Sequence, residues 1–270
     1  MAASLRIGVL LSGSGTNFRA IAAACHNGAI DGQVVFVGSD NPRAKGLDYG
    51  RRCGIPVFTV DYRSVIRRVC DGTIPTGPSD FVLDDVQAKQ SLMPAHSDPG
   101  KLKSFLISRA AAEAQLLEKM AAYPFDLLVL AGFMRTLTPY FLDRVNVAPR
   151  QLRVMNIHPA LLPAFPGVDG YGDTFRYGCK VAGCTVHFVD YGEDTGPIIA
   201  QRAFPIRETD TLESIRKRGL QLEWQLYPAC IQLFAEGRLR LVRTRLQPPV
   251  GQQTSRTVVR IAPDGQTQAP

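Results

Sequence analysis

The sequence predicts an α/β fold in which a doubly wound, mostly parallel sheet forms one main domain. Short apolar runs alternate with segments of helical periodicity, which is the pattern of successive βαβ units. A glycine-rich turn follows the first apolar run, at the place where such folds bind ligands. The length of 270 residues and the 45% hydrophobic content suit one such domain with extensions.

The first half of the chain supplies three strands and two helices in alternation. Residues 5–11 predict the first strand, and a helix follows in which apolar residues recur at helical spacing until Gly28. Residues 34–37 predict the second strand, residues 43–54 a helix, and residues 56–60 the third strand.

The alternation breaks at residue 62 and resumes near residue 100. Clusters of Pro, Gly, Asp and Ser make this stretch too long for an ordinary connection, so we expect an insertion over about 62–100. An amphipathic helix over 102–120 then leads into residues 126–131, a continuous apolar run of the kind buried on both faces. That run is expected at the centre of the sheet.

Three further strands and a long helix complete the expected domain, 1–239. Residues 153–156 predict the fifth strand, and residues 181–189 and 198–206 predict a strand pair joined by an acidic loop. Asp210 and Glu213 resemble a capping box that opens a helix running past Trp224, and Pro228 is expected to kink it. Residues 240–270 then form a C-terminal extension, expected as a hairpin and a flexible tail.

Composition narrows the function classes. The net charge of +7 and the pI of 9.2 favour anionic partners, but the basic residues are scattered and accompany no nucleic-acid module. No apolar run reaches the ~18 residues of a membrane span, and the start of the chain lacks the features of a signal peptide. Six cysteines without C-x-x-C spacing argue against a zinc site or a disulfide framework. We therefore expect a cytoplasmic protein without metal, with no nucleic-acid or membrane partner.

The turn Ser12-Gly-Ser-Gly-Thr-Asn17 ends the first strand and opens a helix. Free N–H groups and the positive end of the helix dipole favour an anion such as phosphate there. It is not a Walker A loop, and Phe18 stands where the dinucleotide fingerprint has its third glycine. The alternative is a structural turn in which Thr16 or Asn17 caps the helix.

The segment Asn156-Ile-His158-Pro follows a strand and so belongs at the carboxyl edge of the sheet. Residues two apart on an extended segment point the same way, so the two side chains can converge on one oxygen, as acyl transfer requires. A hydrogen-bonding device at the sheet edge is the alternative. His187, in an alternating strand, is expected to be packed or bonded to a partner. His26 and His96, like His187, have weaker claims to a catalytic role than His158.

The acidic loop from Asp190 to Pro197 joins two predicted strands. If Asp194 lies near His158, its carboxylate would orient the imidazole and favour the protonated ring. The alternative is a solvated hairpin loop, and only the fold can decide between them.

Taken together, five motifs resemble phosphoribosylglycinamide formyltransferase, a folate-dependent family of purine synthesis, over about Leu5 to Leu239 apart from the insertion. The motifs occur in the family's order and are Ser12-Gly-Ser-Gly-Thr-Asn17, Ala131-Gly-Phe-Met-Arg135, Asn156-Ile-His-Pro-Ala-Leu-Leu-Pro163, His187-Phe-Val and Asp194-Thr-Gly-Pro197. The resemblance implies a Rossmann-like formyltransferase fold and transfer of the formyl group of 10-formyltetrahydrofolate to the amine of glycinamide ribonucleotide.

The resemblance also implies roles for individual residues. It assigns catalysis to Asn156, His158 and Asp194, the substrate phosphate to Gly15, Thr16 and Asn17, and a further substrate contact to Glu223. The residues that it assigns to folate are Arg109, Met134, Arg135, Thr136, Leu137 and Asn156. Residues 168–175 depart from the family's leucine- and histidine-containing stretch, which leaves the substrate contacts there open.

Three alternatives remain at this point. A formyltetrahydrofolate hydrolase would use the same trio with water as acceptor, but that family usually carries an extra N-terminal regulatory domain, and here the first strand is expected to start at about Leu5. A formyltransferase for initiator tRNA or a nucleotide sugar would fit the phosphate loop and Glu223 less well. A non-catalytic module that binds phosphorylated metabolites would not need the catalytic trio.

Overall fold

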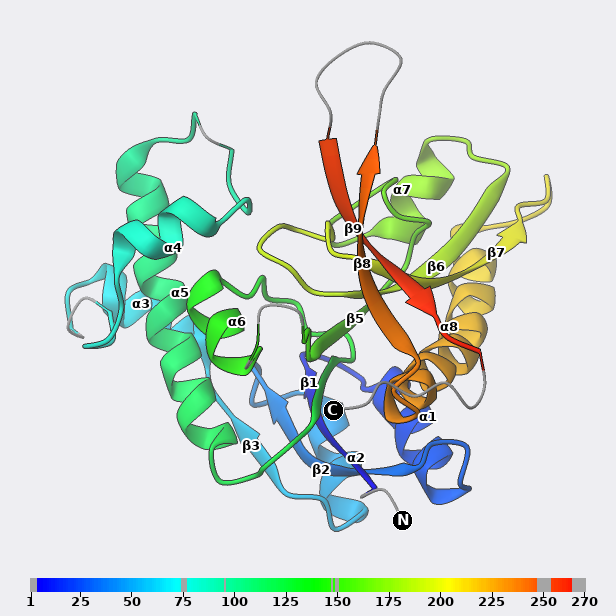
Figure 1. Ribbon diagram of the computed structural model, residues 1–270, viewed down its shortest axis with the longest axis horizontal. Helices are drawn as coiled ribbons and strands as arrows, with labels where there is room; N and C mark the ends of the chain where they lie inside the picture. The colour runs from blue at the N-terminus through cyan, green and yellow to red at the C-terminus, as the bar shows by residue number, and fades with distance from the viewer. Residues whose placement is uncertain are drawn as a thin grey trace.

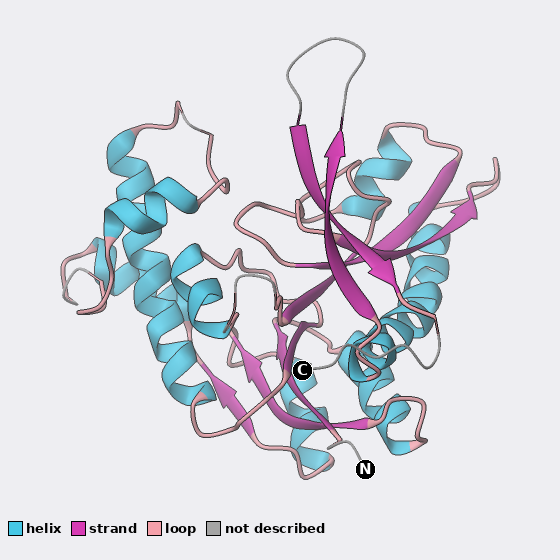
Figure 2. Ribbon diagram, in the orientation of Figure 1, coloured by secondary structure: helices cyan, strands magenta, loops and turns pink. Residues whose placement is uncertain are grey.

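A seven-stranded sheet between two layers of helices organises the chain, with strand order β3-β2-β1-β4-β5-β6-β7 (Figures 1 and 2). The predicted doubly wound α/β class is confirmed. The structure is a computed structural model that describes residues 4–73, 77–94, 96–146, 148, 151–246 and 254–263.

The sheet is parallel over five strands and antiparallel at one edge. Its parallel strands are β1 (Leu5–Leu11), β2 (Gly32–Ser39), β3 (Val57–Thr59), β4 (Leu127–Leu130) and β5 (Val154–His158). The antiparallel strands are β6 (Val181–Phe188) and β7 (Ile198–Pro205). All seven were predicted within a few residues. As expected, β4 lies at the centre.

Helices cover both faces because the strand side chains alternate between two cores. Ile7, Val9 and Leu11 of β1 are buried on the face that also holds α1 (Thr16–His26), α2 (Lys45–Arg52) and α8 (Leu212–Ala235). Leu10 and Phe36 are buried on the other face, with α3 (Tyr62–Cys70), α5 (Pro99–Met120) and α6 (Pro139–Val145). No helix in the described ranges is long and apolar enough to cross a bilayer.

The predicted insertion over 62–100 contains two of the helices, α3 and the short α4 (Leu83–Lys89). Val86 packs with Leu102 and Leu106 in a small separate core, which attaches this stretch to α5. At its end, the Ser91 N–H donates to the Tyr191 carbonyl at 2.8 Å, three residues before Asp194. The stretch therefore supports the acidic loop, while its exact boundaries as an insertion stay a prediction.

The start of α8 corrects the predicted capping box. Thr211 is the N-cap, and its side chain accepts from the Ser214 N–H while the Ser214 hydroxyl accepts from the Thr211 N–H. The box lies one residue later than the predicted Asp210–Glu213 pair. The reason is that the hydroxyls of Thr211 and Ser214 each accept a hydrogen bond from the backbone N–H of the other residue. The helix continues through Pro228 to Ala235. Between β5 and β6 lies one further short helix, α7 (Gly170–Arg176).

The predicted C-terminal hairpin is formed by β8 (Leu239–Leu246) and β9 (Thr254–Ile261). Leu239, Leu241 and Val259 pack against the core shared by β1 and α8, so the hairpin is attached rather than separate. The predicted flexible tail falls mainly on residues 264–270, which lie outside the described residues. The division into a domain of 1–239 and an extension of 240–270 stays a prediction.

Candidate active site

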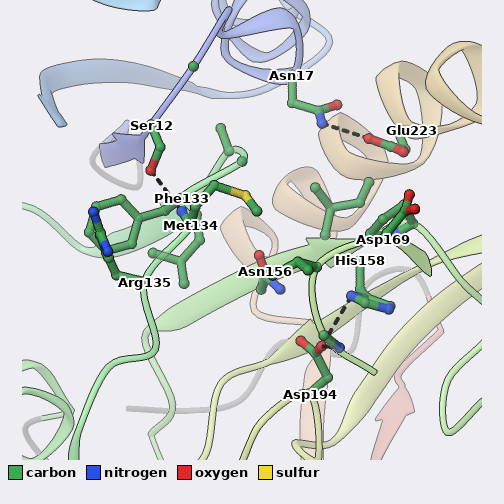
Figure 3. A pocket seen from close by; sticks show the side chains of 18 of the residues that line it. Ser12, Asn17, Phe133, Met134, Arg135, Asn156, His158, Asp169, Asp194 and Glu223 are labelled. Atoms are coloured by element: carbon green, nitrogen blue, oxygen red, sulfur yellow. Dashed lines mark hydrogen bonds and ion pairs between the residues drawn. The ribbon is translucent and has the colours of Figure 1, made fainter. Parts of the chain in front are cut away.

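A cavity of about 590 Å³ opens at the carboxyl ends of β1, β4 and β5, the edge at which parallel α/β sheets bind ligands. It brings together the predicted phosphate turn, the predicted catalytic residues, residues 134–137 and Glu223. These positions are up to about 210 residues apart in sequence, and the parallel order of the strands places them side by side. Figure 3 shows the side chains that line this cavity.

His158 and Asp194 form the predicted pair. His158 ends β5, and its Nδ1 lies 3.2 Å from Oδ2 of Asp194, while its Nε2 lies 2.8 Å from the Phe165 carbonyl oxygen (Figure 3). Both ring nitrogens face acceptors, so the imidazolium satisfies both contacts and a neutral ring satisfies one. The alternative of a solvated loop for Asp194 is wrong, because the structure holds this carboxylate against a buried histidine.

Asp194 is held in its ionised form. Burial acts to raise the pKa of this carboxyl, but the His187 side chain, the charge of His158 and the Gly167 N–H together outweigh burial and lower the pKa. The Gly167 N–H donates to Oδ2 at 2.9 Å. Asp194 adopts a left-handed backbone with a φ of 54°, which is uncommon outside glycine and turns its side chain to these partners.

Asn156 lies beside His158 on β5 and contacts a histidine that sequence reasoning had not placed in the site. Its Nδ2 is 3.2 Å from Nε2 of His187, whose Nδ1 is 2.9 Å from the Phe188 carbonyl oxygen. Since a carbonyl only accepts, Nδ1 of His187 carries a proton, and Nε2 faces both the Asn156 amide and, at 3.5 Å, Oδ1 of Asp194. The Asn156 amide keeps its second N–H for a ligand.

The phosphate turn reaches the cavity through its backbone. Gly15 is the N-cap of α1 with a φ of 70° and makes no side-chain capping bond. The alternative in which Thr16 or Asn17 caps the helix is therefore wrong. Instead the first turn of α1 starts at Thr16 without a capping side chain, which leaves its N–H groups for an anion.

Asn17 and Glu223 are joined inside the cavity. The Asn17 amide nitrogen donates to Oε2 of Glu223 at 2.7 Å, and the Tyr171 hydroxyl donates to Oε1 at 2.8 Å (Figure 3 draws the first bond). Glu223 is 5% exposed, and burial raises its pKa against the opposing effect of these two donors and of His158. One N–H of the Asn17 side chain is thus already bound to Glu223, and its second side-chain N–H and its backbone N–H remain for a ligand.

The segment Met134–Leu137 lines the side of the cavity opposite Glu223 (Figure 3). Ser12 accepts from the Met134 N–H at 2.7 Å, which ties the segment to the phosphate turn. The Arg135 guanidinium bonds Oδ2 of the buried Asp40 at 2.6 Å. Met134 is 54% exposed and offers an apolar surface to a ligand.

The comparisons with known proteins decide the family. The family profile described as "Formyl transferase" matches residues 5–231. The chain belongs to the formyl transferase family.

This formyl transferase is similar to several named proteins. It is 34% identical to the phosphoribosylglycinamide formyltransferase of Bacillus subtilis (strain 168), over 84% of this chain and 93% of the relative. It is 32% identical to the phosphoribosylglycinamide formyltransferase of Escherichia coli (strain K12), over 88% of this chain and 90% of the relative. The solved glycinamide ribonucleotide transformylase 1 from Symbiobacterium toebii covers 97% of this chain and 96% of its own, with a TM-score of 0.69 and 38% identity. The predicted resemblance is confirmed.

Arg109 is one predicted site residue of this formyl transferase that the cavity does not include. It lies on α5, partly buried over the Phe105 ring, and its Nη1 has no hydrogen-bond partner among the described residues. Burial, and next the charge of Arg135, lower the pKa of its guanidinium. Its role toward folate stays a prediction.

Sequence reasoning about this formyl transferase missed three residues that line the cavity. His187 was expected as a packed or bonded histidine, which is correct, but its nearness to Asp194 was not foreseen. Tyr171 lies in the stretch that departs from the family, so no motif indicated it. Arg216, bonded to Asp169 at 2.8 Å, was counted only among the scattered basic residues. Within the described residues, no cluster of three or more His, Cys, Asp or Glu is arranged to hold a metal.

Proposed function

We propose that this formyl transferase moves the formyl group of 10-formyltetrahydrofolate to the amine of glycinamide ribonucleotide. The observation that carries the proposal is that one cavity holds the Asn156, His158 and Asp194 cluster together with a phosphate-type helix N-terminus. The relatives named phosphoribosylglycinamide formyltransferase support the same formyl acceptor.

The residues suggest how the two substrates would be held. The backbone of Gly15, Thr16 and Asn17 would take the ribonucleotide phosphate, and Glu223 would contact the part of the substrate that lies deeper in the cavity. Met134–Leu137 would hold the folate on the opposite side. The net charge of +7 suits two anionic substrates.

The reaction requires stabilisation of one oxygen and movement of two protons. As the substrate amine bonds to the formyl carbon, negative charge develops on the formyl oxygen, and the free N–H of Asn156 would donate to it. His158, protonated beside Asp194, would donate its Nε2 proton once a ligand replaces the Phe165 carbonyl as its acceptor. The carbon–nitrogen bond to the folate then breaks, that nitrogen takes a proton, and the attacking amine loses one.

The rival functions have less support. A hydrolase would have no use for a phosphate-type turn and an Asn17–Glu223 pair in the cavity of the catalytic trio. The relatives described above are named for phosphoribosylglycinamide, and neither tRNA nor a nucleotide sugar stands in those names. A binding module would not need an ionised Asp194 behind a buried histidine.

All six cysteines are unpaired, which suits the cytoplasm that we also propose.

The test is an absorbance assay of folate conversion with and without the ribonucleotide. We expect loss of 10-formyltetrahydrofolate to depend on glycinamide ribonucleotide, with formylated amine formed in equal amount. Equal turnover without the amine would indicate the hydrolase. Binding of both ligands without turnover would indicate a binding module.

A further inference from the structure

Tyr171 is a buried residue of the cavity that no step of the proposed reaction uses. It lies on α7, is 5% exposed, and its hydroxyl donates to Oε1 of Glu223 at 2.8 Å. A buried tyrosine hydroxyl needs a hydrogen-bond partner, and here that partner is the residue predicted to contact the substrate. The position of Glu223 therefore depends on a contact from outside its own helix.

Gly219 makes the space that Tyr171 occupies. A Cβ atom at this position of α8 would lie 2.1 Å from Cζ of the Tyr171 ring and 2.3 Å from its hydroxyl oxygen. Gly219 and Glu223 are four residues apart and so share one face of the helix. Glycine weakens a helix interior, so its presence here is explained by a ring that packs against the backbone and reaches Glu223 one turn later.

Asn17 completes a chain of three side chains. Its Nδ2 donates to the other carboxylate oxygen of Glu223, across 206 positions in sequence. A carboxylate only accepts, so this contact fixes which end of the carboxamide faces Glu223 and leaves Oδ1 as a buried acceptor. Oδ1 has no partner among the described residues.

An unpaired buried acceptor in a ligand cavity needs a donor on the ligand. A phosphate group offers no such donor at neutral pH, whereas ribose hydroxyls and amide or amine N–H groups do. The Asn17–Glu223 pair is therefore suited to the hydroxyl and nitrogen groups of the substrate, beyond the phosphate that the backbone of the turn would bind.

We propose that Tyr171, packed in the space left by Gly219, is a positioning residue that fixes Glu223 and Asn17 as acceptors for the hydroxyl and N–H groups of the ribonucleotide. The proposal rests on the proposed function for the identity of that substrate. Tyr171 acts through Glu223, so its loss affects ribonucleotide binding more than the chemical step.

Tyr171→Phe tests the role of the hydroxyl, since the ring and its packing remain. We expect the KM for glycinamide ribonucleotide to rise about tenfold, the scale of one hydrogen bond to a charged group, with the folate KM and kcat within about twofold. Tyr123→Phe removes a hydroxyl from a residue that packs on the opposite face of the sheet and does not line this cavity. It is the matched control and should leave all three constants unchanged. An unchanged ribonucleotide KM in Tyr171→Phe overturns the proposal.

Gly219→Ala tests the packing with the hydroxyl still present. The added methyl group displaces the ring, so the same rise in ribonucleotide KM is expected, while Gly100→Ala in α5 should have no such effect. A Gly219→Ala enzyme with a normal ribonucleotide KM contradicts the packing argument.

A second measurement needs no turnover. The Tyr171 bond acts to lower the pKa of Glu223, so the titration midpoint of its carboxyl ¹³C resonance should rise in Tyr171→Phe and stay in place in Tyr123→Phe. A midpoint that does not move overturns the positioning role. If the wild-type protein fails to formylate the ribonucleotide, the proposed function is wrong, and this titration still decides the role of Tyr171.

Discussion

His158 has a hydrogen-bond acceptor at each ring nitrogen. The carboxylate of Asp194 lies at Nδ1 and the Phe165 carbonyl at Nε2, and the ring is 3% exposed. A ring that carries a proton on both nitrogens would satisfy both acceptors, and it is the form that can donate a proton during acyl transfer. Phe165 has a φ of 55°, a backbone strain that directs its carbonyl to this nitrogen.

We expect His158 and Asp194 to act as one unit. His158→Ala should lower kcat by about a hundredfold or more, since it removes a donor that acts in the transition state. Asp194→Asn should also slow turnover, and the double variant should be little slower than His158→Ala because coupled residues lose activity non-additively. Steady-state kinetics check this, with the exposed His26→Ala as the control.

Two results would oppose this assignment. Losses that multiply in the double variant would mean that the residues act independently. Near-normal turnover in His158→Ala would return this histidine to a structural role at the sheet edge.

The phosphate turn acts as an element, and its two glycines differ in what they do. A Cβ at Gly15 would lie 2.9 Å from the Gly46 Cα, and its φ of 70° disfavours any side chain. A Cβ at Gly13 meets nothing within 4 Å. A side chain at Gly15 therefore affects both the folding of the turn and the binding of a ligand. A side chain at Gly13 only occupies open space beside the turn.

The prediction for this element follows from that difference. Gly13→Val should raise the KM for the ribonucleotide at least about tenfold and leave the folate KM and the melting temperature nearly unchanged, because a side chain blocks the approach of phosphate to the N–H groups. Gly15→Val should raise the same KM and also lower the melting temperature. A Gly13→Val enzyme with a normal ribonucleotide KM would show that the turn is only structural.

The element after residue 62 shows how local sequence can hide a structural role. Lys89 bonds Asp143 at 2.8 Å, and Asp143 accepts from the Tyr191 hydroxyl at 2.5 Å, while Ser91 bonds the Tyr191 backbone. These contacts connect α4 to the loop that carries Asp194. The Pro- and Gly-rich composition predicted an insertion, but gave no indication that it would contact this loop.

Across the whole molecule, Glu113 makes stability depend on pH. It is fully buried on α5, and burial raises its pKa to about 7 even though Thr138 donates two hydrogen bonds to it. The folded state therefore binds the proton more tightly than the unfolded chain does. This group's contribution to stability is present at about pH 4.5 and below, and is lost as the pH rises to about 7.

Glu113→Gln tests this dependence, since a neutral amide can bond Thr138 at every pH. As the pH rises from about 5 to about 8, the free energy of unfolding of the wild type should decrease relative to that of the variant. The reason is that folded Glu113 still holds a proton that the unfolded chain has already lost, and glutamine has no such proton. Denaturant titrations at both pH values measure the difference, and Glu118→Gln on the exposed side of α5 is the control. A wild type and variant that change in parallel would mean that Glu113 does not titrate in this range.

The sequence by itself determined the order along the chain of the seven sheet strands and of helices α1, α2, α5 and α8, because that order depends on local periodicity. Apolar runs of residues 5–11 and 126–131 predict buried parallel strands wherever they occur, and a strand followed by Asn156 and His158 predicts a carboxyl edge. Local signals gave element boundaries within a few residues, and failed where two residues compete for one role, as at the Thr211 cap.

Only the tertiary structure decided which side chains meet. Asn17 reaches Glu223 across 206 positions, His187 joins Asp194 from β6, and Tyr171 reaches Glu223 through the space at Gly219. Arg109 is not part of the cavity lining. Periodicity reports the face on which a residue lies, but contacts between distant residues depend on how whole elements pack. The spacing of apolar residues in the sequence therefore indicated which residues lie at the carboxyl edge of the sheet, and the packing of the elements decided the geometry of the site.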